Sequence, residues 1–548
     1  MQSLNKFKSF SPNINGLLFT FALALYFSCI LNIPALVRII KILNSLESVE
    51  IGFAISIPIL LVLSLNVFFT LFSIKYFEKP FFITITMLSS IISYAMYNYG
   101  VIFDTSMIDN IFQSNYHEIS SYLNLPVCLW FTLFGLIPAF VIYKINIVHS
   151  SFIKDILAKA AAAVISLLII TLIAMLYYKD YASVKRNNSD ANKMIIPLHF
   201  IYSSCKYINK KYFSPPTPYR QLGLDAKNKA LHNNHKNFLL LFVVGETARS
   251  MNYQINGYDK ETNKHTKNLD LISFENVTSC GTNTAISIPC MFSSLARKNY
   301  SPLTAENQDN LLDILKHAGL NVLWLDNNAG CYQVCKNVAS INMNQSKNKW
   351  CDGHSCVDEI LLVDLQKRID SLKGKDSVIF LHLIGSHGPT YYQRFPKEHQ
   401  HFQPGCQRSD IQNCTSEELL NTYDNSILYT DFVLNEAIKI LGKNNKTWHT
   451  SIMYVSDHGE SLGEKGLYLH GFPYNIAPIE QTNVPYITWF SESFIKSKKL
   501  NIACLKNKAA TGRYSHDNIF SSVLGLMDIA TTEYQKEQDM FYPCRGGE

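Results

Sequence analysis

Long apolar segments fill the first third of this chain and restrict its fold more than any other feature. Five runs approach or exceed the ~20 residues that a helix needs to cross a bilayer. They cover about 15–36, 50–74, 80–103, 125–147 and 157–178. Short polar loops separate them, which argues against five buried helices of a soluble core. The sequence therefore predicts an α-helical membrane domain with five transmembrane helices over residues 1–178.

Basic residues lie before the first run, between the second and third, and between the fourth and fifth. They are Lys6, Lys8, Lys75, Lys79, Lys144 and Lys154. Loop 104–124 contains neither Lys nor Arg, whereas Arg38 and Lys41 fall on the opposite side and count against the pattern. The positive-inside rule places the N-terminus in the cytoplasm, so five spans would export everything after about residue 178.

Cysteine usage is an independent test of this placement. Of thirteen cysteines, only Cys29, Cys128 and Cys205 precede residue 280. Short spacings predict disulfides in an oxidising compartment, and a fifth pair follows by elimination. The pairs are Cys280/Cys290, Cys331/Cys335, Cys351/Cys356, Cys406/Cys414 and, by elimination, Cys504/Cys544. A zinc–thiolate site is the weaker alternative, because no Cys-x-x-Cys occurs.

The rest of the chain has the pattern of a soluble α/β domain. After a bridging segment at 179–235, short continuous apolar runs alternate with helical stretches such as Asn310–His317 and Glu417–Leu441. The runs suit buried parallel strands. They are Phe238–Val244, Val322–Leu325, Ser377–Ile384 and Ile452–Val455. Residues 236–548 are therefore predicted to form an α/β domain with a mainly parallel sheet.

Polar side chains follow each of the four predicted strands. Glu246 follows the first, an Asp-Asn-Asn segment ending at Asn328 the second, His387 the third, and Asp457 and His458 the fourth. Ligand sites of open α/β sheets gather at the carboxyl ends of strands. Turn or cap residues would explain any one of these ends, but less readily all four. Asn328 is expected to bind substrate.

Residues 280–290, Cys-Gly-Thr-Asn-Thr-Ala-Ile-Ser-Ile-Pro-Cys, resemble a loop entering a helix. A hydroxyl there faces unpaired N–H groups and the positive end of the helix dipole, so it can hold or attack a phosphate. Thr284 is the candidate nucleophile. Its oxygen, with Glu246, Asp457 and His458, would form a zinc site, and zinc would lower the pKa of the threonine hydroxyl.

Two further histidines, His387 and His470, lie in glycine-flanked loops. A lone histidine is more often structural, but both share the loop chemistry of the predicted site. They could bind phosphate oxygens, protonate a leaving group or hold a second zinc ion. The net charge of +6 is modest, and no basic stripe interleaved with aromatic residues is present, so nucleic acid is not an expected partner. An anionic lipid surface remains a candidate partner.

Several motifs together resemble the phosphoethanolamine transferases, which modify lipid A and include the mobile colistin-resistance proteins. The resemblance covers nearly the whole chain. The motifs are Val244-Gly-Glu-Thr-Ala-Arg249, Ser279-Cys-Gly-Thr-Asn-Thr-Ala-Ile-Ser-Ile-Pro-Cys-Met-Phe292, Ser386-His-Gly-Pro-Thr-Tyr391, Ser456-Asp-His-Gly-Glu-Ser461 and Ser515-His-Asp-Asn518. The resemblance implies an alkaline phosphatase/sulfatase-type domain in the periplasm, anchored in the bacterial inner membrane by a multi-pass domain.

The resemblance also implies residue roles. Zinc would be bound by Glu246, Thr284, Asp457 and His458, with Thr284 as the nucleophile. His387 and His470 would act on the substrate phosphate or on a second zinc. Asn110, Ser114 and Glu118 match the head-group-binding pattern, and their spacing of four would place them on one face of a helix.

Two positions depart from the family pattern. The family often has a lysine that contacts phosphate shortly after its Asp-Asn-Asn segment. The aligned residue here is Tyr332, and a nearby serine position holds Ala329. Lys336 is the candidate replacement for that lysine.

The reaction expected from the resemblance is transfer of phosphoethanolamine from phosphatidylethanolamine to lipid A or another envelope glycan, through a covalent intermediate on Thr284, by a monomer. The alternative on the same fold is a phosphoglycerol transferase, or a phosphodiesterase or sulfatase. Thr284 argues against a sulfatase, which needs a modifiable Cys or Ser. A membrane sensor or adhesin with an inactive domain is a further alternative, against which the intact ligand set argues.

Overall fold

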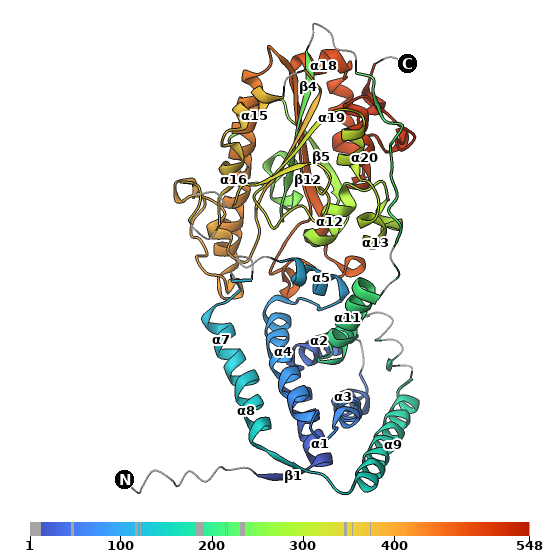
Figure 1. The fold of residues 1–548 in the computed structure, drawn as a ribbon. Helices are drawn as coiled ribbons and strands as arrows, with labels where there is room; N and C mark the ends of the chain where they lie inside the picture. Colours follow the sequence, from blue (N-terminus) through green and yellow to red (C-terminus); the bar gives the residue numbers. More distant parts are fainter. Residues whose placement is uncertain are drawn as a thin grey trace, which may run out of the picture. The chain divides into compact units, whose positions relative to one another are not determined.

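The structure is a computed structural model, and it divides the chain into two compact units. The first comprises Met1–Ile108 and Leu123–Tyr212, and the second Asp109–Tyr122 and Phe213–Glu548 (Figure 1). The described residues are 12–44, 49–114, 119–120, 122–178, 180–181, 184, 191–213, 215, 217–230, 236–344, 348–352, 355–372 and 374–546. The limits 1–178, 179–235 and 236–548 stay a prediction.

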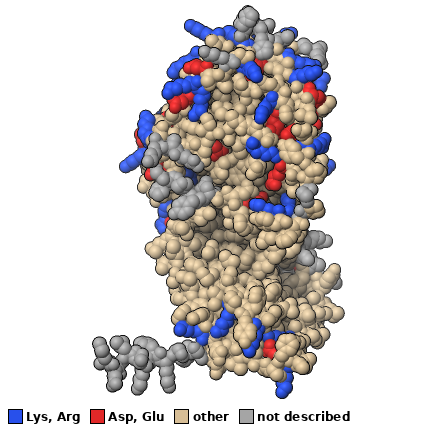
Figure 2. Space-filling view, in the orientation of Figure 1, with Lys and Arg blue, Asp and Glu red and all other residues tan. Residues whose placement is uncertain are grey.

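Four helices of the first unit are long and apolar enough to cross a membrane, within the described residues. They are α3 (Ile51–Phe72), α4 (Glu78–Tyr99), the stretch Leu125–Lys144 and α9 (Phe152–Leu176). The third consists of α7 (Leu125–Phe131), the π-helical turn η2 (Thr132–Leu136) and α8 (Ile137–Lys144). Much of this unit in Figure 2 carries no charged side chain, and Lys and Arg gather at one end of it. Hydrocarbon favours helices because they satisfy their own backbone groups.

The segment predicted as one span over about 15–36 is a bent pair of helices. α1 (Gly16–Tyr26) and the π-helical turn η1 (Phe27–Leu31) meet α2 (Ile33–Asn44) at 61°. Pro34 has no N–H for the helical ladder, and the Asn32 amide donates to the carbonyls of Phe27 (3.0 Å) and Ile196 (2.6 Å). The described helices amount to four spans, or five if this pair counts as one, so the predicted count of five is not confirmed.

The second unit is built on an eight-stranded mixed sheet with the order β13-β5-β12-β9-β4-β8-β6-β7. The strands are β4 (Asn237–Gly245), β5 (Ile272–Thr278), β6 (Asn321–Asp326), β7 (Ala339–Asn342), β8 (Ser377–His382), β9 (Trp448–Ser456), β12 (Asn483–Phe490) and β13 (Tyr514–Ser515). Five neighbouring strands, β9 through β7, are parallel as predicted. β12 pairs antiparallel with both β9 and β5, so the sheet is mixed. Five of its seven strand pairings are parallel, which agrees with the predicted mainly parallel sheet.

Helices cover both faces of this sheet. In Figure 1, α16 (Ser416–Lys443) lies on one side, and α12 (Thr284–Met291) and α20 (Asp517–Leu526) lie on the other. The central strands β4, β8 and β9 are buried along almost their whole length, which explains their unbroken apolar runs. All five predicted disulfides are confirmed. They fit an oxidising compartment, whereas Cys29, Cys128 and Cys205 are free.

Candidate active site

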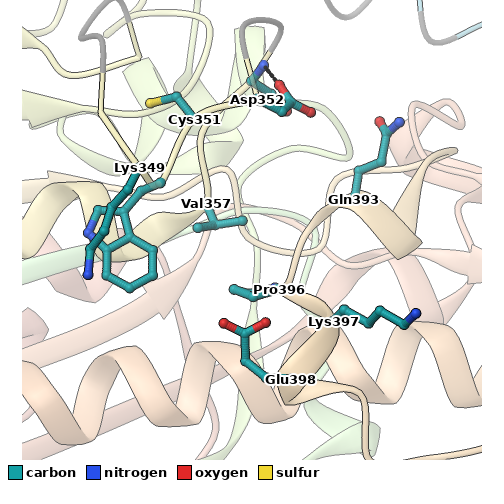
Figure 3. Close-up of a pocket in the computed structure, with 10 residues that line it drawn as sticks. Lys349, Cys351, Asp352, Val357, Gln393, Pro396, Lys397 and Glu398 are labelled. Carbon is teal, nitrogen blue, oxygen red and sulfur yellow. Dashed lines mark hydrogen bonds between the residues drawn. The ribbon is translucent and has the colours of Figure 1, made fainter.

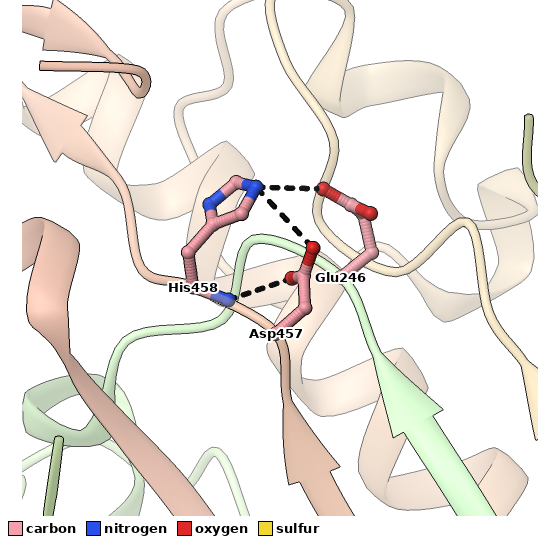
Figure 4. Close-up of side chains that lie close together, drawn as sticks. All are labelled: Glu246, Asp457 and His458. Atoms are coloured by element: carbon pink, nitrogen blue, oxygen red, sulfur yellow. Dashed lines mark hydrogen bonds and ion pairs between the residues drawn. The ribbon is translucent and has the colours of Figure 1, made fainter. Parts of the chain in front are cut away.

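Two parallel strands place three of the predicted ligands together. β4 and β9 pair in register up to Gly245 and Ser456, so the residues that follow them leave the same edge of the sheet. The Asp457 N–H donates to the Gly245 carbonyl at 2.9 Å and continues the ladder by one bond. Glu246, Asp457 and His458 are all fully buried there, and their ligand atoms lie within 4.8 Å of one another (Figure 4).

Thr284 is the first residue of α12, and the preceding loop positions it. Asn283 caps the helix by accepting a hydrogen bond from the Ile286 N–H at 3.1 Å. The Ser287 hydroxyl donates to the Asp457 carbonyl, and the Cys280–Cys290 disulfide links the loop to the end of the helix. These contacts bring the Thr284 Oγ1 to 3.2 Å from Glu246 Oε2.

The four side chains have the spacing of a tetrahedral metal site. Zinc–ligand bonds of 2.0–2.2 Å require ligand atoms about 3.3–3.6 Å apart. His458 Nε2 lies 3.3 Å from Thr284 Oγ1, 3.3 Å from Glu246 Oε1 and 3.4 Å from Asp457 Oδ2. Asp457 Oδ2 is also buried without a hydrogen-bond partner, which an oxygen aimed at a cation would explain. The donor set therefore fits a divalent metal ion such as zinc.

The electrostatics of the three ligands favour a bound cation. Burial acts to lower the pKa of His458, but the charges of Asp457 and Glu246 outweigh it and raise this pKa to about 10. Burial and the Glu246 charge raise the pKa of Asp457. Burial opposes ionisation of Glu246 as well, but the hydrogen bond and charge of His458 lower its pKa well below the ordinary value. The pair of acids thus stabilises positive charge at this point.

Backbone geometry around Glu246 holds the carboxylate in place. Thr247 has a φ of 58°, which is uncommon for a β-branched residue. In this conformation its hydroxyl donates to Glu246 Oε1 at 2.6 Å and its N–H to Asp457 Oδ1 at 3.1 Å. Gly385 has a φ of 51°, and a Cβ there would lie 2.6 Å from the Glu246 carbonyl oxygen. Only glycine permits this close approach.

His387 and His470 flank the ligand set, as the sequence predicts. Their ring centroids are 5.3 Å apart, and that of His470 is 4.4 Å from His458. The His470 loop is joined to the nucleophile loop, because the Gly471 N–H donates to the Thr282 carbonyl at 2.7 Å. Burial lowers the pKa of both His387 and His470 to about 3, so both rings are neutral at pH 7. Their roles toward substrate stay predictions.

Asn328 contacts the site through a metal-ligand candidate. Its amide Nδ2 donates to Glu246 Oε2 at 2.9 Å and to the Leu383 carbonyl at 2.8 Å. The first bond orients the Glu246 carboxylate, and the second holds the Asn328 amide in place. A contact between Asn328 and substrate, as the sequence predicts, stays untested.

Three supporting residues were not identified as site residues from the sequence. Buried Glu460 accepts from the Tyr391 hydroxyl at 3.0 Å and lies 3.3 Å from His470 Nδ1. Buried His516 accepts from the Cys280 N–H at 3.1 Å and contacts the Ser456 carbonyl at 3.0 Å. The three residues, Tyr391, Glu460 and His516, all lie inside the motifs that carry the family resemblance, and this position was the one sequence signal that could have identified them. Their partners are distant in sequence, so the contacts themselves could not be predicted.

Of the three residues expected to bind the head group, two are described. Asn110 lies in α5 (Thr105–Gln113), and the Ser114 hydroxyl donates to its carbonyl at 3.0 Å. Glu118 lies outside the described residues. Residues 109–122 group with the second unit. The head-group role of all three stays a prediction.

Lys336, the candidate replacement for the family lysine, has two partners of its own, and its role toward phosphate stays a prediction. Its Nζ donates to the Glu306 carbonyl at 2.7 Å and lies 4.5 Å from the ring centroid of Tyr219. Tyr332, at the position of the family lysine, lies inside the Cys331–Cys335 disulfide loop with a φ of 47°.

The fold and this ligand set define a membrane-anchored enzyme of the sulfatase type. The Sulfatase family model matches residues 239–529, and the model named Phosphoethanolamine transferase EptA/EptB matches residues 61–212.

Relatives cover nearly the whole chain. Phosphoethanolamine transferase EptA of Escherichia coli K12 is 37% identical over 97% of this chain and 98% of its own. Phosphatidylethanolamine transferase Mcr-1 of Escherichia coli is 32% identical over 90% of this chain and 91% of its own. The solved integral membrane lipooligosaccharide phosphoethanolamine transferase A of Neisseria meningitidis is 36% identical, with a TM-score of 0.94 over 97% of this chain and 99% of that one. This chain belongs to the phosphoethanolamine transferase family.

Proposed function

We propose that this enzyme transfers phosphoethanolamine from phosphatidylethanolamine to lipid A or another envelope glycan. The observation that carries the proposal is the Thr284 hydroxyl, 3.2 Å from Glu246 and 3.3 Å from His458 within a buried ligand set. Membership of the family supports the donor. The Neisseria relative is named for lipooligosaccharide, which supports a glycolipid acceptor.

Glu246, Asp457, His458 and Thr284 would hold the zinc ion, which would favour the ionised threonine oxygen and offset negative charge on the phosphate. His387 and His470 are neutral imidazoles, so each can donate one N–H to a phosphate oxygen. A second zinc ion at these two histidines is the alternative role. Asn328 keeps Glu246 oriented throughout.

The transfer proceeds in two displacements at phosphorus. Thr284 Oγ1 attacks the donor, the bond from phosphorus to the glycerol oxygen breaks, and diacylglycerol leaves with a proton. An acceptor phosphate or hydroxyl oxygen then attacks phosphorus, the bond from phosphorus to Thr284 breaks, and Thr284 takes up the acceptor's proton, which restores the free enzyme. Two bulky lipids thereby use one site in turn, which predicts ping-pong kinetics.

The proposed setting is the bacterial inner membrane. The apolar helices anchor the monomer beside its lipid donor, and the second unit faces the periplasm. The disulfides of that unit support an oxidising compartment. Addition of an ethanolamine ammonium group would reduce the negative charge of the envelope and weaken the binding of cationic peptides.

Mass spectrometry of envelope lipids and glycans, from cells with and without this protein, tests the proposal. An added phosphoethanolamine group on lipid A or a glycan is the expected result and identifies the acceptor. Envelopes of identical mass, with the protein expressed and folded, would contradict it. A Thr284→Ala strain is the matched control.

A further inference from the structure

A cleft of about 470 Å³ opens on the catalytic unit, and none of the residues of the site described above lines it. Its walls come from two parts of the chain, residues 349–352, 355 and 357 on one hand and residues 393 and 396–398 on the other. Figure 3 shows Lys349 on one side, Gln393 and Lys397 on the other, and Val357 and Pro396 between them. The Cys351–Cys356 disulfide links the two described stretches of the first wall, 349–352 and 355–357.

The lining combines an apolar surface with separated polar groups. Trp350, Val357 and Pro396 supply the apolar part, and the Lys349 ammonium lies 4.2 Å from the Trp350 ring centroid. Gln393, Glu398 and Lys397 supply donors and acceptors of both charges. An aromatic ring can stack on the C–H face of a sugar, and amide and carboxylate groups can bind its hydroxyls. Exposed lysines suit a phosphate or carboxylate on that sugar.

Both walls are hydrogen-bonded to elements of the active site. Arg394, next to Gln393, donates from Nε to the His387 carbonyl at 2.7 Å. Asp358, next to Val357, accepts from the Gly385 N–H at 2.9 Å and from the Asn327 amide at 2.8 Å. The cleft therefore shares its framework with the histidine loop and with the Asn327–Asn328 turn.

We propose that this cleft binds the sugar portion of the anionic glycan acceptor, with one sugar ring against Trp350 and its phosphate or carboxylate near Lys349 or Lys397. This inference rests on the proposed function and adds a second contact to the acceptor, outside the reacting phosphorus. The mixed charge of the lining argues against free phosphate as the ligand, because an anion alone would meet Glu398 and Asp352 as well as the lysines.

Binding is tested on the full-length protein in detergent by saturation-transfer NMR, with glucosamine 6-phosphate as the probe and inorganic phosphate in a separate arm. The expected result is saturation of the sugar C–H protons, with an affinity at least about tenfold weaker in Trp350→Ala and severalfold weaker in Gln393→Ala. Lys446→Ala, an exposed lysine outside the cleft, is the matched control. Equal affinity in both cleft variants and the control, or equal competition by inorganic phosphate, would overturn the inference.

Kinetics separate this inference from the proposed function. Both cleft variants should release diacylglycerol from phosphatidylethanolamine at the wild-type rate, while KM for lipid A rises about tenfold in Trp350→Ala. An unchanged KM for lipid A in both variants would contradict the assignment of the cleft and leave the proposed function intact. Absence of diacylglycerol release by the wild-type enzyme would instead contradict the proposed function. The binding experiment would then still show whether the cleft binds a sugar phosphate.

Discussion

The Thr284 Oγ1 lies 3.3 Å from the Nε2 of His458, although 174 positions separate the two residues. A hydroxyl at the first residue of a helix and an imidazole after a central strand meet because α12 begins, and β9 ends, at the same edge of the sheet. If this hydroxyl is the nucleophile, Thr284→Ala should form no phosphoethanolamine adduct, and turnover should fall by at least about a thousandfold.

Intact-protein mass spectrometry after incubation with phosphatidylethanolamine measures the adduct. Thr284→Ser, which keeps a hydroxyl, is the matched control and should retain some adduct. An adduct of the same mass in Thr284→Ala would show that another residue is the nucleophile.

Metal affinity should fall as the pH falls. The pKa of His458 in the metal-free site is about 10, so at neutral pH a metal ion must displace a proton from this ring. Each unit of decrease between pH 9 and pH 7 should weaken binding about tenfold, and protonation of Asp457, whose pKa is raised, should steepen the loss at lower pH. Competition with a chelator measures this, and an affinity independent of pH would contradict the ligand assignment.

Glu460 should affect turnover by orienting the ring of His470. Burial raises the pKa of Glu460 well above the ordinary value and favours its neutral carboxyl, which can donate a hydrogen bond to His470 Nδ1, 3.3 Å away. This bond would fix the ring with Nε2 protonated. Glu460→Gln keeps a donor and should retain activity within severalfold, whereas Glu460→Ala should lower kcat at least about tenfold. Equal activity in the two variants at equal metal content would argue against this positioning role.

His516 should make stability depend on pH. Burial lowers its folded-state pKa to about 3, below the ~6.5 of an exposed histidine. The folded state therefore prefers the neutral ring. The contribution of this ring to the free energy of unfolding is fully present above pH 6.5 and declines as the pH falls toward 3. Between pH 7 and pH 5 the free energy of unfolding should fall by about 2 kcal/mol because of this residue. Thermal unfolding of the wild type and of His516→Gln, at both pH values, should show a smaller pH effect in the variant, and equal effects would refute this contribution.

The Cys280–Cys290 disulfide should stabilise the nucleophile loop. The two cysteines are 10 positions apart, and closure of a loop of this length contributes about 2–3 kcal/mol. The double substitution to serine should therefore lower the unfolding temperature and slow adduct formation on Thr284. The pair Cys504–Cys544, 40 positions apart, is the comparison, because its removal should lower stability without an equal effect on the adduct.

The sequence predicted the candidate metal ligands better than the residues that position the groups around them. Glu246, Asp457 and His458 follow apolar runs that suit buried parallel strands, so their convergence could be predicted from the topology of parallel sheets. The contact of Glu460 with His470 depends on the path of a loop, and no local pattern reports that path. β12 is not among the four strands predicted from the sequence, and its antiparallel direction could not be predicted from composition, because a buried run has the same composition in either direction.

The bend after η1 shows the same limit in the membrane unit. A hydropathy pattern counts apolar residues and cannot reveal that Asn32 will find a partner far along the chain. Its Oδ1 accepts from the Ile196 N–H at 2.8 Å, and 164 positions separate the two residues.

That distance has a consequence for biosynthesis. The two backbone groups of Ile196 that pair with Asn32 emerge from the ribosome only after every apolar helix has been made. Until then the Asn32 amide has only the Phe27 carbonyl as a partner, and its Oδ1 waits for the Ile196 N–H. Completion of the bundle is thereby delayed until the chain beyond the last helix returns, and a chaperone or insertase would have its longest opportunity to act on the earliest segment.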